Sequence, residues 1–150
     1  MPISDVMTVA DDILRAGKER GLSFTPLQLM KLTYIAHGYA LGEGLGDLFD
    51  ARIEAWKYGP VIPDLYHVTK TWGRNPIPHD HIYEGRALDG AAARVIDRVL
   101  DKYGRMSGAA LSTLTHKPGT PWSKVYRDGV LGIEIPDSDI RDHYQNLVAA

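Results

Sequence analysis

The chain has 150 residues, of which 44% are hydrophobic and 24% are charged, a composition typical of a folded globular protein. Its formal net charge of -2 supplies no overall attraction to nucleic acid or to an anionic membrane, and the lack of cysteine excludes disulfides and thiolate metal sites. No signal peptide or apolar run of about 20 residues is apparent, so we predict a cytoplasmic protein with no membrane partner. A single domain over residues 1–150 is the expectation for this length.

Two helices are predicted in the first third of the chain. Asp5 precedes apolar residues at helical spacing and can cap a first helix that ends near Gly17 or Gly21. Thr25, followed by a proline, caps a second helix over residues 27–41, in which few side chains are polar. Because this second helix is apolar on nearly every side, we expect it to lie at the centre of the fold.

Two short runs predict a small antiparallel ribbon. Residues 51–58 read as one strand, and residues 131–135, whose apolar side chains alternate with other residues, read as its partner. Between these runs, apolar residues from Val61 onward recur at helical intervals. Pro63 near the start and Gly73 at the end then bound a third helix.

The second half of the chain predicts four more helices. They begin at Leu88, Ser107, Thr120 and either Asp137 or Ser138, and the last of them is expected to turn three side chains inward: Ile140, Tyr144 and Leu147. The predicted fold is therefore mainly α, a compact single-domain bundle of about six or seven helices with a two-stranded antiparallel β ribbon.

Few residues suggest catalysis or metal binding. His79, Asp80 and His81 are the most metal-like group, but a site needs a third ligand from elsewhere, and a solvated loop is the simpler interpretation. His37 shares a helix face with Tyr34 and reads as a buried neutral imidazole bonded to a carbonyl or hydroxyl, because no nucleophile accompanies it. We therefore predict no enzymatic activity, no cofactor and no metal.

A DNA-binding regulator of its own operon is the alternative function. Thr25 and the helix that follows it resemble the second element of a helix-turn-helix. However, a recognition helix needs exposed polar side chains aimed at base edges, and this one offers only Gln28 and Lys31. The sequence therefore disfavours nucleic acid as a partner.

Two large aromatic residues lie beside a Gly-Pro turn in residues 53–61. If Ile53 faces inward along a strand, then Glu54, Trp56 and Tyr58 share the opposite face. Either a second layer covers that face or it is offered to a partner, for which Trp and Tyr are favoured anchors. Both interpretations remain open from the residues alone.

Several blocks of the chain, in order, resemble the Panacea domain of SocA-like antitoxins. They are residues 29–37, residues 53–66 with their Glu-Ala-Trp and Gly-Pro-Val motifs, residues 111–116 and residues 119–122. The resemblance covers nearly the whole chain. The positions that match the family pattern include Lys31, Tyr34, His37, Gly59, Pro60, His116, Pro121 and Trp122.

The resemblance implies a bacterial, phage-associated antitoxin, encoded beside a protein toxin that it neutralises by direct contact. Some members of that family act as proteolytic adaptors, which implies a second partner, an ATP-dependent protease of the Clp type. We expect a folded surface to contact the toxin. The residues predicted for that surface are Glu54, Trp56, Tyr58, Asp64 and Tyr66.

Overall fold

The computed structural model describes residues 2–79 and 87–149. Over these ranges the chain forms seven α-helices, one short 3-10 helix and one two-stranded antiparallel sheet, which confirms the predicted fold class. None of the helices in these ranges is long and apolar enough to cross a membrane. In chain order the elements are α1 (Val6–Glu19), α2 (Pro26–Gly42), β1 (Glu54–Trp56), β2 (Gly59–Val61), α3 (Pro63–Thr69), η1 (Lys70–Trp72), α4 (Gly90–Tyr103), α5 (Gly108–His116), α6 (Pro121–Val125) and α7 (Asp137–Ala149).

The first two helices begin at the predicted caps. The Asp5 carboxylate accepts a hydrogen bond from the Thr8 backbone N–H (3.0 Å) at the start of α1. Thr25 and Gln28 form a capping box at α2, because each side chain accepts a hydrogen bond from the other residue's backbone N–H. Both helix starts therefore follow from local side-chain chemistry.

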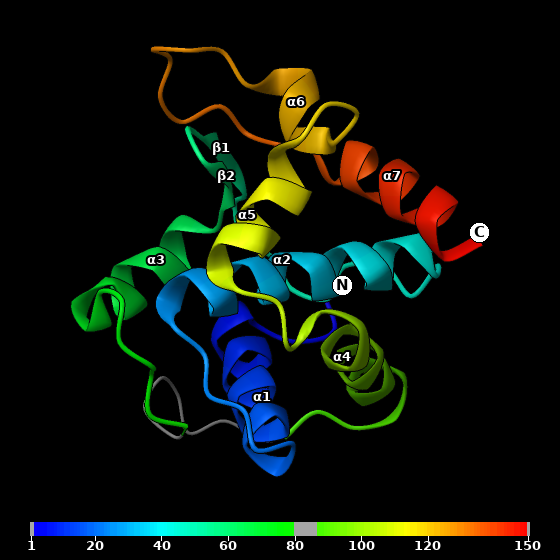
Figure 1. The fold of residues 1–150 in the computed structure, drawn as a ribbon. Helices are drawn as coiled ribbons and strands as arrows, with labels where there is room; N and C mark the ends of the chain where they lie inside the picture. Colours follow the sequence, from blue (N-terminus) through cyan, green and yellow to red (C-terminus); the bar gives the residue numbers. More distant parts are fainter. Residues whose placement is uncertain (1, 80–86, 150) are drawn as a thin grey trace.

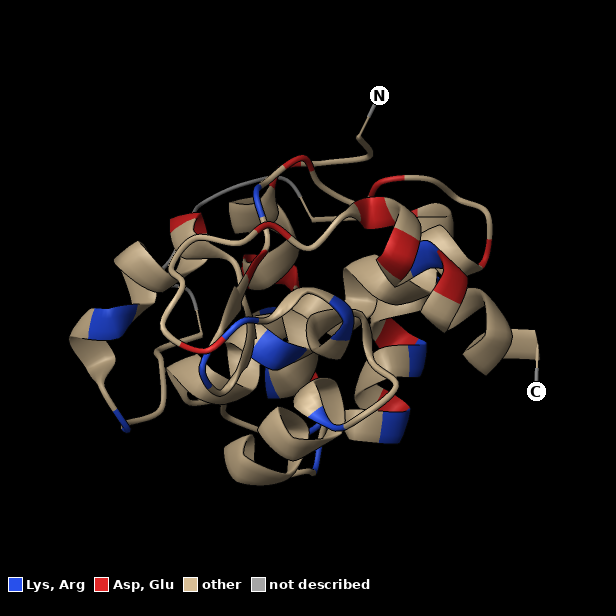
Figure 2. Ribbon diagram, turned by 90° about the horizontal axis from the view of Figure 1, so that it is seen from above, with Lys and Arg blue, Asp and Glu red and all other residues tan. Residues whose placement is uncertain are grey.

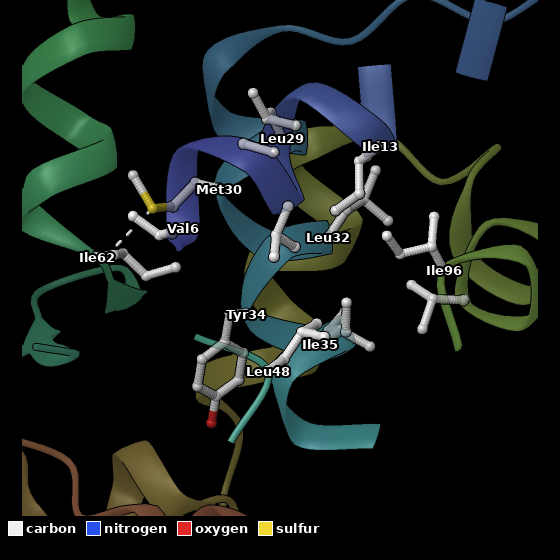
Figure 3. Close-up of a cluster of buried hydrophobic side chains, with 14 of the residues drawn as sticks. Val6, Ile13, Leu29, Met30, Leu32, Tyr34, Ile35, Leu48, Ile62 and Ile96 are labelled. Carbon is white, nitrogen blue, oxygen red and sulfur yellow. Dashed lines mark hydrogen bonds between the residues drawn. The ribbon is translucent and has the colours of Figure 1, made fainter. Parts of the chain in front are cut away.

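Helix α2 lies at the centre of the molecule, as its composition predicts. It contacts α1, α3, α4, α5, α7 and β2, and it is buried from Leu29 to Leu41 (Figure 1). Its side chains meet those of α1, α4 and the residues around Leu48 in one apolar core (Figure 3). The Ile62 backbone N–H donates a hydrogen bond to the Met30 sulfur (3.2 Å), which joins the core to the segment that follows the ribbon.

The predicted partner of the first strand is confirmed only as an isolated antiparallel bridge between Glu54 and Glu134, and the main pairing of the ribbon is a different one. Strand β1 pairs with β2, with Ala55 opposite Pro60, so the ribbon is a tight hairpin. Lys57 and Tyr58 form the turn, and Gly59, which begins β2, has a φ of +124° that favours glycine. The run at residues 131–135 still lies alongside β1, because the Ala55 N–H donates to the Ile133 carbonyl (2.8 Å).

Two other expectations are corrected by the structure. Val61 belongs to β2, and the third helix begins at Pro63 and changes at Lys70 into the 3-10 turn that Gly73 ends. On α7 the buried side chains include Ile140 and Tyr144, as predicted, whereas Leu147 is 38% exposed. Leu147 lies in the last turns of α7, at the edge of the packed surface.

Candidate partner-binding site

The turn between the two strands rests on a buried lysine. Lys31 is 1% exposed, and its amine donates a hydrogen bond to the Pro60 carbonyl (2.7 Å). A Cβ added to Gly59 would lie 3.0 Å from that amine, so glycine suits both the backbone angle and the space. Burial lowers the pKa of the Lys31 amine to about 7. The family positions Lys31, Gly59 and Pro60 therefore form one structural unit.

Trp56 is half-buried and held at three points. Its indole N–H donates to the Glu54 carboxylate (3.0 Å), and its ring packs edge-on against Tyr66 at 5.0 Å between centroids. Its backbone carbonyl accepts a hydrogen bond from the Trp122 indole (2.6 Å). The Trp56 and Arg52 hydrogen bonds lower the pKa of Glu54, so that carboxylate is ionised and already engaged by Trp56 and Arg52.

Trp122 belongs to a support layer behind Trp56. It stacks on Tyr126 at 4.5 Å between centroids, and His116 meets its ring edge-on at 5.2 Å. His116 donates a hydrogen bond from Nδ1 to the Ser112 carbonyl in the last turn of α5. Pro121, at the start of α6, is buried. These family positions support the ribbon, and the His116 ring satisfies a carbonyl in the last turn of α5.

Tyr58 differs from Trp56 in that most of its side chain meets solvent. It lies in the hairpin turn, 66% exposed, while Lys57 lies over its ring at 5.5 Å from the centroid. The Ser112 hydroxyl donates to the Tyr58 backbone carbonyl, so the main chain is held and only the ring is free. Tyr58 is outside β1, so strand alternation does not place it beside Glu54 and Trp56.

An apolar groove opens beside these rings, between the hairpin, α3 and the start of α2. Its volume is about 450 Å³. We call it the aromatic groove, and its lining consists of Pro26, Leu27, Met30, Lys31, Trp56, Lys57, Tyr58, Val61, Tyr66, Thr69, Lys70 and Gly73. Three of the five predicted contact residues, Trp56, Tyr58 and Tyr66, meet here. Glu54 lies behind Trp56, and Asp64 is exposed in the first turn of α3, outside the lining.

Two further family positions lie in the core. Tyr34 is 1% exposed, and burial raises its pKa. His37 is also buried and stacks on Phe49, but its Nε2 contacts the Asp137 carboxylate (3.0 Å) instead of the expected carbonyl or hydroxyl. No local signal predicts this partner, because 100 residues separate the two side chains.

His37, Asp47 and Asp137 place three potential ligand atoms within 4.8 Å of one another. Burial and a hydrogen bond to Asp137 raise the pKa of Asp47, whereas the His37 hydrogen bond lowers that of Asp137. Metal-bound histidine normally donates its second ring N–H to an acceptor. Among the described residues, Nδ1 of His37 has no such partner. This arrangement fits a hydrogen-bonded cluster that ties α7 to α2.

The structure describes only part of the loop that holds the candidate metal ligands His79, Asp80 and His81. His79 contacts the Leu22 carbonyl through Nε2 (2.9 Å), so its ring packs against the segment that connects α1 and α2. Asp80 and His81 lie outside the described residues.

Several groove residues were missed by the sequence reasoning. Leu27 belongs to the helix that was expected to be apolar on nearly every side and central, yet it is 43% exposed at the groove. Val61 was expected in the third helix, and Lys70 carries no local signal. Their placement at the groove depends on the hairpin folding back over α2, a tertiary event that periodicity does not report.

The arrangement of these blocks matches a known family. A family model described as "Antitoxin SocA-like, Panacea domain" matches residues 29–123, which include the hairpin, Lys31 and Trp122. The chain belongs to the SocA-like antitoxin family. Its Panacea domain is also similar to "Antitoxin SocA" of Caulobacter vibrioides (strain NA1000 / CB15N), with 32% identity over 156 residues that cover 94% of this chain and 82% of that protein. No solved structure matches the chain.

Proposed function

We propose that this chain neutralises a cognate protein toxin by binding it at the aromatic groove, with no bond made or broken. The observation that carries the proposal is the gathering of Trp56, Tyr58 and Tyr66 around an apolar groove in a chain of an antitoxin family. Trp and Tyr dominate the binding energy of many interfaces, because their large rings bury much apolar area. We further propose that residues 1–150 act as a single domain.

The groove alone is smaller than a whole interface. A stable protein complex buries roughly 800 Å² on each partner, so the toxin contact would extend beyond the lining. Asp64 and the outer surface of α3 lie next to the groove and would form part of the rim. The half-buried Trp56, braced by Trp122, would give this rim a rigid base.

The DNA-binding alternative is disfavoured by the position of α2. A recognition helix must lay exposed side chains in the major groove. Helix α2 is buried from Leu29 to Leu41, and Lys31, one of its two polar candidates, is inside the protein. A gel-shift assay with the upstream DNA at physiological salt tests this alternative, and tight sequence-dependent binding would promote it.

Co-expression with the product of the adjacent gene tests the proposal. We expect the wild-type chain to restore growth, and the variant Leu27→Ala/Tyr58→Ala to fail while remaining folded. Leu147→Ala is a matched control, because Leu147 is exposed to a similar degree as Leu27 but lies at the end of α7. Full rescue by the groove variant would refute the placement.

Following the toxin in the same co-expressing cells distinguishes masking of the toxin from its delivery to a protease. If the antitoxin masks the toxin, the toxin should persist in complex with it. If the antitoxin is an adaptor, the half-life of the toxin should fall only when both the antitoxin and a Clp-type protease are present. A pulse-chase experiment with and without the protease measures that half-life.

A further inference from the structure

The charges around the aromatic groove have one sign. All charged residues in its lining are lysines: Lys31, Lys57 and Lys70. Lys57 and Lys70 are exposed at the rim, and Lys31 lies buried at the floor. Within the part of the chain that the structure describes, the lining contains no Asp or Glu. Because burial lowers the pKa of Lys31 to about 7, the positive charge at the groove comes mainly from Lys57 and Lys70, in a chain whose formal net charge is -2.

The rim lysines are held next to the aromatic rings. The Lys57 amine lies 5.5 Å from the Tyr58 ring centroid, and the Lys70 amine lies 6.0 Å from that of Tyr66. Both distances are within the range of cation–π attraction. Each cation thus lies beside one of the aromatic rings that line the groove.

The carboxylates near these lysines lie outside the lining of the groove. Glu54 is engaged by the Trp56 indole and by Arg52. Asp64 is outside the lining, in the first turn of α3. The acidic residues gather elsewhere: red bands crowd the first turns of α7, whereas the outer end of the α3 and η1 segment carries a blue band (Figure 2). Lys57 also borders a second hollow that Glu54 and Asp128 line, whereas within the lining of the aromatic groove the lysines have no carboxylate beside them.

The groove has the size and chemistry to receive one large side chain or two smaller ones. Its volume of about 450 Å³ is within the range of roughly 300 to 1,000 Å³ that is usual for binding pockets. Its floor includes Met30, whose flexible thioether adapts to different shapes, and Val61. An apolar anchor would bury against these residues, while charges beside it would meet the lysines at the rim.

We infer that the aromatic groove binds a polypeptide segment in which a large apolar side chain is flanked by Asp or Glu. The inference rests on the proposed function and specifies the chemistry of the partner. Opposite charges at the rim would steer the segment and fix its register, while the apolar anchor would supply most of the affinity.

Labelled synthetic peptides test this chemistry by fluorescence anisotropy at physiological salt. One peptide carries Trp and Leu anchors flanked by Glu, and the second has Lys in place of each Glu. The third keeps Glu but has Ala in place of the anchors. We expect the first to bind the full-length chain about tenfold or more tightly than either of the others. Equal behaviour of the Glu and Lys peptides, including a shared lack of binding, would overturn the inference.

A charge-swap variant sharpens the test. Lys57→Glu/Lys70→Glu should lose affinity for the Glu peptide and gain affinity for the Lys peptide, because only the rim charges are reversed. Lys18→Glu/Lys102→Glu is the matched control, with the same change in net charge on exposed residues of α1 and α4. An equal loss in both variants would mean that overall charge, and not the groove, governs binding.

The same variants and labelled ligands would also reveal whether something other than an acidic segment binds the groove. Concentration-dependent dimerisation in size-exclusion chromatography that Lys57→Glu/Lys70→Glu abolishes would assign the groove to a second copy of the chain. Anisotropy with a labelled DNA duplex would reveal nucleic acid. Either result would overturn the inference.

The inference and the proposed function can fail separately. If Leu27→Ala/Tyr58→Ala abolishes toxin neutralisation but Lys57→Glu/Lys70→Glu does not, the proposed function stands and the acidic partner is wrong. If neither variant affects neutralisation, the placement of the toxin at the groove fails as well.

Discussion

Tyrosine is buried in the central helix but exposed at the groove. Tyr34 on α2 is 1% exposed, whereas Tyr58 in the hairpin turn is 66% exposed. Around Tyr34 the chain closes on every side, while beside Tyr58 it leaves an apolar groove open. Both tyrosines belong to the motif-bearing part of the sequence. Some motif residues therefore build the core, and others support a surface that folding leaves available.

The largest effect should come from filling the contact between α2 and α7. A Cβ on Gly38 would lie 2.4 Å from the buried ring of Tyr144, so Gly38→Ala must displace that ring or the helix. We expect the free energy of unfolding to fall by about 3 kcal/mol in urea denaturation, a typical cost of overpacking a core. Adding Tyr144→Leu should recover part of that loss. An unchanged stability would show that the two helices are loosely packed.

The next effect concerns the buried lysine beneath the hairpin. The pKa of Lys31 falls from its ordinary value near 10.5 to about 7 in the folded protein. Between these two values the unfolded chain binds more protons, so the stability of the wild type should rise with pH. The slope approaches about 1.4 kcal/mol per pH unit for one proton. Lys31→Met should lack that slope.

Denaturation of both proteins between pH 7.5 and about 9 measures the difference, below the range where unfolded tyrosines ionise. Parallel stability curves for wild type and Lys31→Met would contradict the lowered pKa. The substitution also leaves the Pro60 carbonyl without its donor, which changes stability equally at every pH and leaves the slope as the readout.

Removing the hydroxyl group from two buried tyrosines should change the stability by smaller amounts, and in opposite directions. The Tyr39 hydroxyl shares a hydrogen bond with that of Tyr103 (2.9 Å), whereas the Tyr34 hydroxyl has no partner among the described residues. Tyr39→Phe should therefore destabilise the fold by about 1 kcal/mol, and Tyr34→Phe should leave it unchanged or stabilise it. Thermal unfolding compares them, and equal losses would mean that Tyr34 also has a partner.

The smallest effect on stability is expected at the groove. Tyr58→Ala removes an exposed ring but keeps the backbone hydrogen bond from Ser112. Its stability should remain within about 0.5 kcal/mol of wild type. Its affinity for the toxin, measured by isothermal titration calorimetry, should nevertheless fall at least about tenfold. A large loss of stability would instead make Tyr58 a structural residue.

The sequence predicted most of the helices because their signals are local. Caps such as Asp5 and Thr25 and terminators such as Gly73 act within a few residues, and the structure uses each of them. The apolar character of α2 likewise placed that helix at the centre. These inferences needed no knowledge of the tertiary structure.

The candidate site could be predicted only in part, because it is assembled from distant segments. The motif pointed to Trp56 and Tyr58, but nothing local showed that Leu27 and Lys70 line the same groove. The pairing of β1 with β2 was not predicted, because Gly59 and Pro60 were read as a turn, whereas they belong to β2 and the Pro60 carbonyl accepts a hydrogen bond from Lys31. Long-range contacts of this kind decide the site, and periodicity does not contain them.

Hydrogen–deuterium exchange of the antitoxin, free and bound to its toxin, tests the central claim most directly. The account predicts that toxin binding slows exchange in the hairpin turn around Tyr58 and in α3, while the loop at residues 44–46 and the end of α7 stay unchanged. Protection confined to α7 or to that loop, with the hairpin and α3 unaffected, would contradict it.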